Sequence, residues 1–257
     1  MALIRMDHVP DTVKMCIPLY IILPDPKRMN GVPVRERKVL YLLHGLSDDG
    51  SAWQRYSSIE TLAKDYGLVV VMPSVGRSFY IDQPNGIDYF SYLVDELPRY
   101  LDDVFHLAPR REDTFIAGLS MGGYGAMKAA LLHPERYSVA ATFSGLLSLN
   151  HLQQYPDDPR KPEFQFLFGD LSKLPGSEHD PEVWLRRAAE SKVQLPDLYI
   201  SCGRQDDLYP LSKLFYASCQ KLGFTSYYHE EEGKHDWYFW DSEIKRILSL
   251  VLGPLDK

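Results

Sequence analysis

The residues best suited to chemistry begin with a serine between glycines. Residues 118–122 read Gly-Leu-Ser-Met-Gly and match the pattern G-x-S-x-G. By chance this pattern arises in roughly one chain in ten of this length, but its context is more specific. The apolar run Thr114–Ala117 precedes it, and a helix-forming stretch rich in small residues follows it. Strand, sharp turn and helix form the setting of a nucleophile elbow. The pattern therefore predicts Ser120 as a nucleophile in a strained turn, against the alternative of an idle serine in a glycine-rich turn.

A serine nucleophile needs a base to accept its proton. In the fold that carries this elbow, the chain order is serine, then Asp or Glu, then histidine. His235 lies in the glycine-containing loop 232–237, directly after the predicted strand Thr225–Glu230. We predict His235 as the base. His229 is the main rival, although its place inside the strand pattern favours a packed or surface histidine.

The acid that orients the base should follow the preceding strand, predicted over Leu198–Cys202. Two adjacent carboxylates, Asp206 and Asp207, follow it. We predict Asp206 as the acid because it completes a G-x-x-D turn. Asp207 is expected to cap the next helix, which is a common role for aspartate.

The negative oxygen that develops during acyl transfer requires N–H donors. One is expected from the backbone of Met121, the residue after the nucleophile, and the other from a loop after an earlier strand. His44 and Gly45 follow the apolar run Val39–Leu43, so the sequence predicts Leu46 as the second donor. An ordinary strand-end turn is the alternative here, and His44 itself is expected to be structural.

These residues must be positioned by a scaffold of strands and helices. Short apolar runs that read as buried strands alternate with amphipathic or small-residue helices, which favours a mostly parallel sheet with helices on both faces. In such sheets ligands bind at the carboxyl ends of the strands. The predicted strands are Val13–Leu23, Val39–Leu43, Val69–Met72, Thr114–Leu119, Val139–Phe143, Leu198–Cys202 and Thr225–Glu230. The predicted helices are Ile59–Tyr66, Tyr89–Phe105 with a kink at Pro98, Met121–Leu132, Leu211–Leu222 and Trp237–Leu252.

Residues 146–196 interrupt this alternation with a polar, proline-rich stretch. We interpret the chain 1–257 as one domain, with 146–196 as a small cap-like insertion over the active-site end of the sheet. Phe164, Phe168 and Trp184 of the insertion, together with Trp53, are predicted to narrow a pocket for acyl groups of roughly two to four carbons, because burial of each methylene stops contributing at a wall. The alternative is that these aromatic residues only anchor the insertion and leave an open groove.

Composition excludes several classes of protein. The 257 residues are 45% apolar and 25% charged, which is typical of a globular domain. A net charge of −7 argues against nucleic-acid binding. Three cysteines without a C-x-x-C pair, and no H-E-x-x-H or other compact ligand spacing, predict neither a disulfide framework nor a metal site. No leader or membrane span is recognised, so a cytoplasmic protein is expected. No cofactor is expected, because the chain itself supplies the nucleophile, the base and the N–H donors. Homo-oligomerisation stays open.

Four segments together resemble a known family, the esterase D-like α/β-hydrolases, and are most similar to the bacterial tributyrin esterases of EstA type. These segments span 43–46, 117–126, 202–206 and 233–237. The resemblance implies the α/β-hydrolase fold and a serine carboxylesterase that hydrolyses short acyl esters through Ser120, Asp206 and His235. A feruloyl or acetylated-carbohydrate esterase and an S-formylglutathione hydrolase are alternatives within the family. An inactive binding protein with this fold is an alternative of another class, which the intact Ser, Asp and His argue against.

Overall fold

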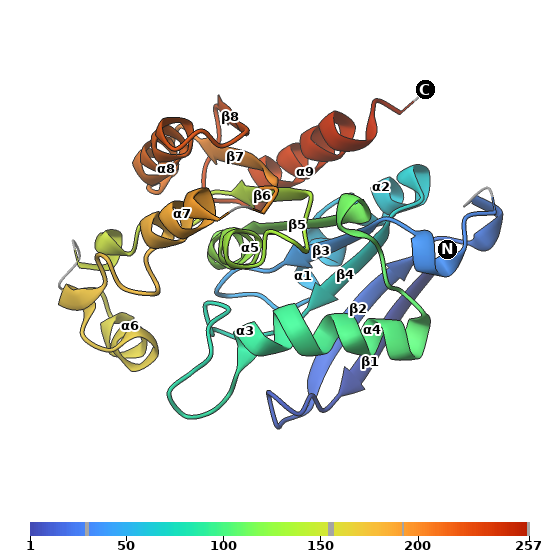
Figure 1. Cartoon of the computed structure of the whole chain (residues 1–257), viewed down its shortest axis with the longest axis horizontal. Helices are drawn as coiled ribbons and strands as arrows, with labels where there is room; N and C mark the ends of the chain where they lie inside the picture. Colours follow the sequence, from blue (N-terminus) through green and yellow to red (C-terminus); the bar gives the residue numbers. More distant parts are fainter. Residues whose placement is uncertain (29–30, 154–156, 192, 256–257) are drawn as a thin grey trace.

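The computed structural model describes residues 1–28, 31–153, 157–191 and 193–255. These residues form one eight-stranded sheet in the order β1-β2-β4-β3-β5-β6-β7-β8 (Figure 1). The strands are β1 Ala2–His8, β2 Ile17–Leu23, β3 Val39–Leu43, β4 Val69–Pro73, β5 Thr114–Leu119, β6 Val139–Phe143, β7 Asp197–Gly203 and β8 Ser226–Glu231.

The sheet is parallel except at one edge. Strands β3 to β8 pair in parallel, whereas β2 pairs antiparallel with both β1 and β4. Every residue of β3, β4 and β5 is buried. This explains their continuous apolar runs, because a parallel strand covered on both faces has no solvent side. The predicted mostly parallel sheet is confirmed.

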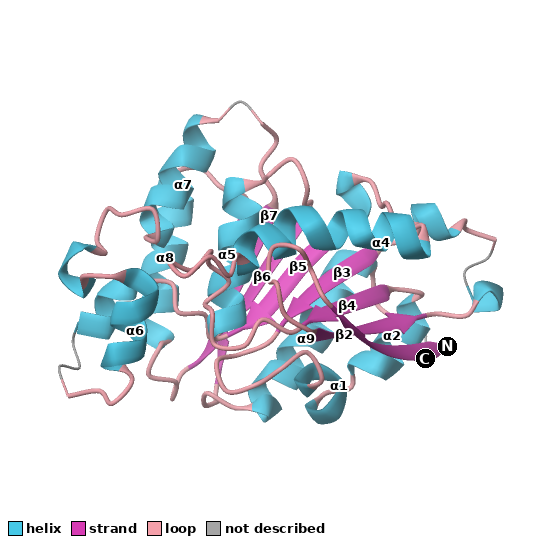
Figure 2. Cartoon of the chain, turned by 90° about the horizontal axis from the view of Figure 1, so that it is seen from below, coloured by secondary structure: helices cyan, strands magenta, loops and turns pink. Residues whose placement is uncertain are grey.

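Helices cover both faces of the sheet (Figure 2). On one face α1 Ala52–Tyr56, α2 Ile59–Tyr66 and α9 Trp237–Leu252 pack with a core that includes Trp53 and Phe143. The other face carries α4 Leu97–Phe105, α5 Met121–Leu132, α7 Pro181–Glu190 and α8 Tyr209–Lys221. None of the helices in the described ranges combines the length and apolarity that a membrane crossing needs.

The predicted helix over Tyr89–Phe105 contains one irregular turn. A helical turn at Tyr89–Ser91 (α3) leads into a π-helical turn at Tyr92–Glu96 and then into α4. Pro98 has no N–H to donate to the carbonyl of Val94, four residues earlier, and the Arg136 guanidinium donates to that carbonyl instead. The helix therefore accommodates Pro98 with a wider turn and continues without a break.

The connection from β6 to β7 divides into two parts. A 3-10 turn at Leu149–Gln153, the helix α6 Lys161–Phe168 and a 3-10 turn at Leu171–Lys173 come first. The second part, α7, packs against α5 and α8 and so belongs to the helical layer. The segment that projects over the strand ends is thus shorter than the predicted insertion 146–196, of which 154–156 and 192 lie outside the described residues.

Candidate active site

Ser120 lies in a strained turn between β5 and α5. Its φ of 52° and ψ of −117° are a conformation that side-chain-bearing residues rarely adopt. A Cβ on Gly118 would lie 2.3 Å from the Gly122 carbonyl oxygen, and one on Gly122 would lie 2.4 Å from the Leu43 oxygen. Only glycines fit where strand and helix come this close. The predicted strand, turn and helix around Ser120 are confirmed.

His235 follows β8 and pairs with a carboxylate from the loop after β7. Its Nδ1 lies 2.8 Å from Asp206 Oδ2. Because the carboxylate accepts, Nδ1 carries the proton and Nε2 has the lone pair that a general base uses. The Trp240 indole packs perpendicular to the imidazole ring, with the ring centres 5.0 Å apart. His235 therefore has its tautomer and its orientation fixed.

Asp206 is buried and hydrogen-bonded on both carboxylate oxygens. Oδ1 accepts the backbone N–H of Leu208 at 2.8 Å, and Oδ2 faces His235. Burial alone would raise the pKa of Asp206, but hydrogen bonds from His235, Ser144 and the Leu208 amide, with the charge of His235, hold that pKa below its usual value. Asp206 thus stays an anion beside the imidazole.

Sequence reasoning missed the support that Ser144 and Trp240 give to Asp206. The indole Nε1 of Trp240 donates to Ser144 Oγ at 3.2 Å, and Ser144 is fully buried with a positive φ at the end of β6. The position directly after a predicted strand was the available signal for Ser144. The aromatic residues 237–240 gave no signal in the sequence that Trp240 would support Asp206.

The loops that carry acid and base are fastened to each other. The Gln205 N–H donates to the Gly233 carbonyl at 3.0 Å, and the Gly233 N–H donates to Gln205 Oε1 at 2.6 Å. A Cβ on Gly203 would lie 2.3 Å from the Gly233 oxygen, so the two backbones touch there. These contacts fix the positions of the Asp206 and His235 loops relative to each other.

The predicted oxyanion donors, Leu46 and Met121, line the same pocket as Ser120. Neither backbone N–H has an acceptor among the described residues. A Cβ on Gly45 would lie 2.6 Å from Leu119 Cδ1, so the loop after β3 approaches the elbow closely because this position lacks a side chain. Two N–H groups without partners beside a serine are what a developing oxyanion needs.

His44 supports this loop as a structural residue. It is fully buried, its Nδ1 donates to the Gly45 carbonyl at 2.8 Å, and its Nε2 accepts the Val75 N–H at 3.1 Å. Burial lowers the pKa of His44 to about 4. His44 is therefore neutral and has no free nitrogen for catalysis.

The pocket above Ser120 has a volume of about 360 Å³, which is within the range of small-ligand sites. Phe164 of the predicted insertion lines it as expected, and Phe79 contributes a second aromatic wall. Other lining residues, which sequence reasoning did not single out, are Leu146, His151, Leu152, Arg160 and Leu208.

Three predicted pocket residues do not line it. Trp53 is fully buried on the α9 face of the sheet, where its Nε1 donates to the Leu43 carbonyl. Phe168 and Trp184 pack behind the pocket, the former against Phe79 and the latter against Tyr124. These predictions were wrong because a large aromatic residue near a site in sequence is as readily drawn into the core as into the pocket.

The rivals of the predicted triad lie elsewhere. His229 faces α9 from β8 and is not among the pocket residues, while Asp207 lines the pocket without contacting His235 in the described structure. Within the described ranges, no group of three potential metal ligands lies beside Ser120. The one group of three potential ligands found among the described residues is His229, Glu231 and Glu243, away from the pocket.

An α/β sheet with a serine elbow and a His–Asp pair at its carboxyl edge defines the class, the serine hydrolases of the α/β-hydrolase fold. Similarity to known proteins narrows this class to a family. Residues 12–250 match the Esterase family, described as "Putative esterase", and the chain belongs to that family.

Its relatives include esterases and thioester hydrolases. The chain is 32% identical over 254 residues, 95% of this chain and 96% of the relative, to an acetyl esterase from Caldicellulosiruptor saccharolyticus. Two solved structures from Staphylococcus aureus are each 34% identical and cover 98% of this chain. One is the fluorophosphonate-binding serine hydrolase F, with a TM-score of 0.89 and 99% of that chain covered. The other is an S-formylglutathione hydrolase, with a TM-score of 0.87 and 98% of that chain covered. The expected α/β-hydrolase fold and serine carboxylesterase activity are confirmed, whereas special closeness to tributyrin esterases stays a prediction.

Proposed function

We propose that this carboxylesterase hydrolyses short-chain acyl esters with Ser120 as nucleophile, His235 as general base and Asp206 as the acid that orients it. The observation that carries the proposal is the meeting of three features in one pocket. The pocket is lined by a serine in a strained elbow, by a histidine held by a buried carboxylate, and by two residues whose N–H groups have no acceptor in the described part of the chain.

In the first half of the reaction Ser120 Oγ attacks the ester carbonyl carbon while His235 Nε2 takes the hydroxyl proton. The carbonyl oxygen becomes an oxyanion and accepts the N–H groups of Leu46 and Met121. Asp206 stabilises the imidazolium. Collapse of the tetrahedral species breaks the ester C–O bond, the leaving alcohol takes the proton from His235, and the acyl group stays on Ser120.

In the second half water replaces the alcohol. His235 Nε2 removes a proton from water as its oxygen attacks the acyl carbon, and the same N–H groups hold the second oxyanion. The bond to Ser120 Oγ breaks and Oγ regains a proton from His235. The products are a carboxylic acid and the free enzyme, with no redox change and no cofactor in either half.

The size of the pocket and one relative support acetyl to butyryl esters as substrates. Phe79 and Phe164, whose ring centres are 5.8 Å apart, form an aromatic end to the pocket above the nucleophile. A relative covered over almost its whole length is an acetyl esterase. S-formylglutathione is a second candidate, because its formyl group is smaller still and one of the similar solved structures is an S-formylglutathione hydrolase.

The test compares wild-type enzyme with Ser120→Ala on nitrophenyl acetate, butyrate and octanoate and on S-formylglutathione. We expect the variant to lose at least about 10³-fold in kcat, because triad members act as a unit. A fluorophosphonate probe should label the wild type at Ser120 alone. Labelling of another serine, such as Ser144, would overturn the assignment. A kcat/KM for the thioester above that for every ester would favour the second candidate.

A further inference from the structure

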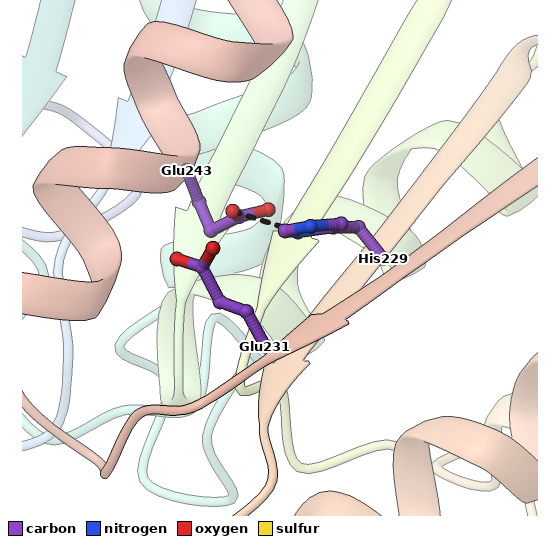
Figure 3. A group of neighbouring side chains, drawn as sticks. All are labelled: His229, Glu231 and Glu243. Atoms are coloured by element: carbon purple, nitrogen blue, oxygen red, sulfur yellow. Dashed lines mark hydrogen bonds and ion pairs between the residues drawn. The ribbon is translucent and has the colours of Figure 1, made fainter.

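A group of three potential metal ligands lies between β8 and α9, outside the active site. His229 and Glu231 come from β8 and Glu243 comes from α9, with one ligand atom of each within 4.8 Å of the others. Figure 3 shows the imidazole and the Glu231 carboxylate turned toward the Glu243 carboxylate. Because Glu243 is distant in sequence from the two residues on β8, no compact motif marks the three in the sequence, and the prediction of no metal site followed from that.

Glu243 is the unusual member because it is a fully buried carboxylate with one oxygen unsatisfied. Oε1 faces His229 Nδ1 at 2.9 Å and Arg246 Nε at 3.5 Å, and the Glu243 side chain is 0% exposed. Oε2 has no hydrogen-bond partner among the described residues, and the Ser201 hydroxyl faces the carboxylate without reaching hydrogen-bonding geometry. A buried carboxylate oxygen without a partner is costly, so its retention calls for an explanation.

Glu231 adds a second negative charge that the protein leaves uncompensated. Alternation along β8 turns Glu230 to the opposite face, where Arg204 pairs with it and with Glu232, the residue after the strand. Glu231 has no ion pair within the described ranges and faces Glu243. The imidazole of His229 and the guanidinium of Arg246 both pair with Glu243. Burial raises the pKa of Glu243 above its usual value despite the opposing effects of His229, Ser201 and Arg246, and the charge of Glu231 adds a smaller rise.

We propose that His229, Glu231 and Glu243 form a binding site for a divalent cation of the Zn²⁺ type. One imidazole and two carboxylates suit Zn²⁺ better than Mg²⁺ or Ca²⁺, which prefer oxygen ligands alone. Tetrahedral ligands about 2.1 Å from Zn²⁺ are about 3.4 Å apart, so the three side chains need only small rotations to close on the ion. His229 is 25% exposed and Glu231 is half-buried, which leaves a path for entry.

Such an ion would fasten the two elements that flank the base. Loop 232–236, which carries His235, joins β8 to α9. A cation bound by Glu231 at the end of β8 and Glu243 on α9 cross-links both ends of this loop. The site therefore supports the active site from outside, without contact with substrate.

Calorimetric titration of the metal-free, tag-free chain with Zn²⁺ tests the proposal. The protein should carry Cys16→Ser, because the exposed thiol of Cys16 is another zinc ligand. We expect one Zn²⁺ per chain and a rise in Tm of roughly 5 °C at a hundredfold excess over Kd. His229→Gln and Glu231→Gln should each weaken binding at least tenfold. Glu230→Gln, on the opposite face of the same strand, should leave Kd within twofold. Mg²⁺ should bind far more weakly than Zn²⁺.

A second measurement guards against variants that fail to fold. Glu231→Gln removes a like charge beside Glu243, so its metal-free Tm should equal or exceed that of the wild type, while the Zn²⁺-induced rise disappears. Absence of stoichiometric Zn²⁺ binding below 1 mM would overturn the proposal and make the cluster a proton-sharing pair. Binding that persists in both ligand variants would also overturn it. Neither readout depends on esterase activity.

Discussion

Ser120 and Asp206 hold their side chains by opposite physical means. Ser120 is held in a strained backbone conformation by the packing around it, which the neighbouring glycines permit. Asp206 is held by hydrogen bonds to its carboxylate from His235 and the Leu208 amide. Strain of this kind costs about 1–3 kcal/mol and persists only where the surrounding packing enforces it. The nucleophile is therefore fixed by the core, and the acid by its own partners.

The different contacts of the adjacent carboxylates Asp206 and Asp207 predict unequal effects on kcat when each is substituted. Asp206→Asn should lower kcat about 10³- to 10⁴-fold, because an amide cannot stabilise the imidazolium and favours the wrong tautomer of His235. Asp207→Asn, which changes a residue of the pocket wall with no contact to His235, should change kcat less than tenfold. Steady-state kinetics on nitrophenyl acetate measures both. The reverse ranking would move the acid to Asp207.

At the level of single residues the sequence predicted the meeting of Ser120, Asp206 and His235 better than it predicted the walls of the pocket. Ser120, Asp206 and His235 each follow a strand, and the carboxyl ends of parallel strands meet at one edge, so their meeting follows from topology. Whether Trp53 or Trp184 faces the pocket depends on side-chain packing, which no local pattern encodes. Ser144 was missed for the same reason, since its value lies in contacts with Asp206 and Trp240.

At the scale of elements, buried strands and the helices beside them were the most predictable features. β5, α5, β6 and α9 have the bounds that their apolar runs predict. The edge strand β1 was missed because all seven of its residues are exposed or half-exposed, and the polar residues Arg5, Asp7 and His8 leave only a short apolar run. The short helix α1 was missed because five residues are too few for a helical period to show.

Helix α5 contains a buried lysine, Lys128, whose positive charge destabilises the folded protein. Lys128 is 7% exposed, its Nζ lies 3.4 Å from the Tyr80 carbonyl and 4.0 Å from the centre of the Phe90 ring. Burial lowers the pKa of Lys128 from 10.5 to about 8. The charged form is therefore disfavoured in the folded protein relative to the unfolded chain, and this penalty is fully present below pH 8.

We expect Lys128→Met to stabilise the protein by about 1–3 kcal/mol at pH 7, because it removes the buried charge and keeps the stem. The unfolded chain binds the extra proton between pH 8 and 10.5, so wild-type stability should rise relative to the variant over that window. Urea unfolding at pH 7 and pH 10 measures the difference. The exposed Lys221→Met is the control and should shift stability at neither pH. A destabilised Lys128→Met would show that contacts with Tyr80 and Phe90 outweigh burial.

At the scale of the molecule, three parts of the chain meet at the active site. The strand ends of the sheet carry Ser120, Asp206 and His235, the loop after β3 carries Leu46, and the segment after β6 closes the pocket. Arg77 links the last two, since its guanidinium donates to both carboxylate oxygens of Glu163 on α6 and to the Leu46 carbonyl. Pocket shape therefore depends on how the segment after β6 is seated on the sheet.

The length of the acyl chain that fits should consequently be set by the wall that α6 contributes. Phe164 is 2% exposed at the pocket and Phe168, one turn later, is 8% exposed but packs behind it. We expect wild-type kcat/KM on nitrophenyl esters to peak at roughly two to four carbons, because each methylene contributes at most about 0.8 kcal/mol until it meets the wall. Phe164→Leu should move the peak to longer chains.

Phe168→Leu is the matched control for this wall, because it removes a similarly buried ring from the same helix without opening the pocket. Both variants should lose stability, by roughly 1–3 kcal/mol, since each leaves a cavity. Only Phe164→Leu should change the chain-length profile. If both variants shift the peak alike, loosening of α6 and not the wall controls selectivity. A wild-type kcat/KM that rises steadily to eight carbons and beyond would mean that the pocket has no wall and that the aromatic residues of α6 serve only to anchor it.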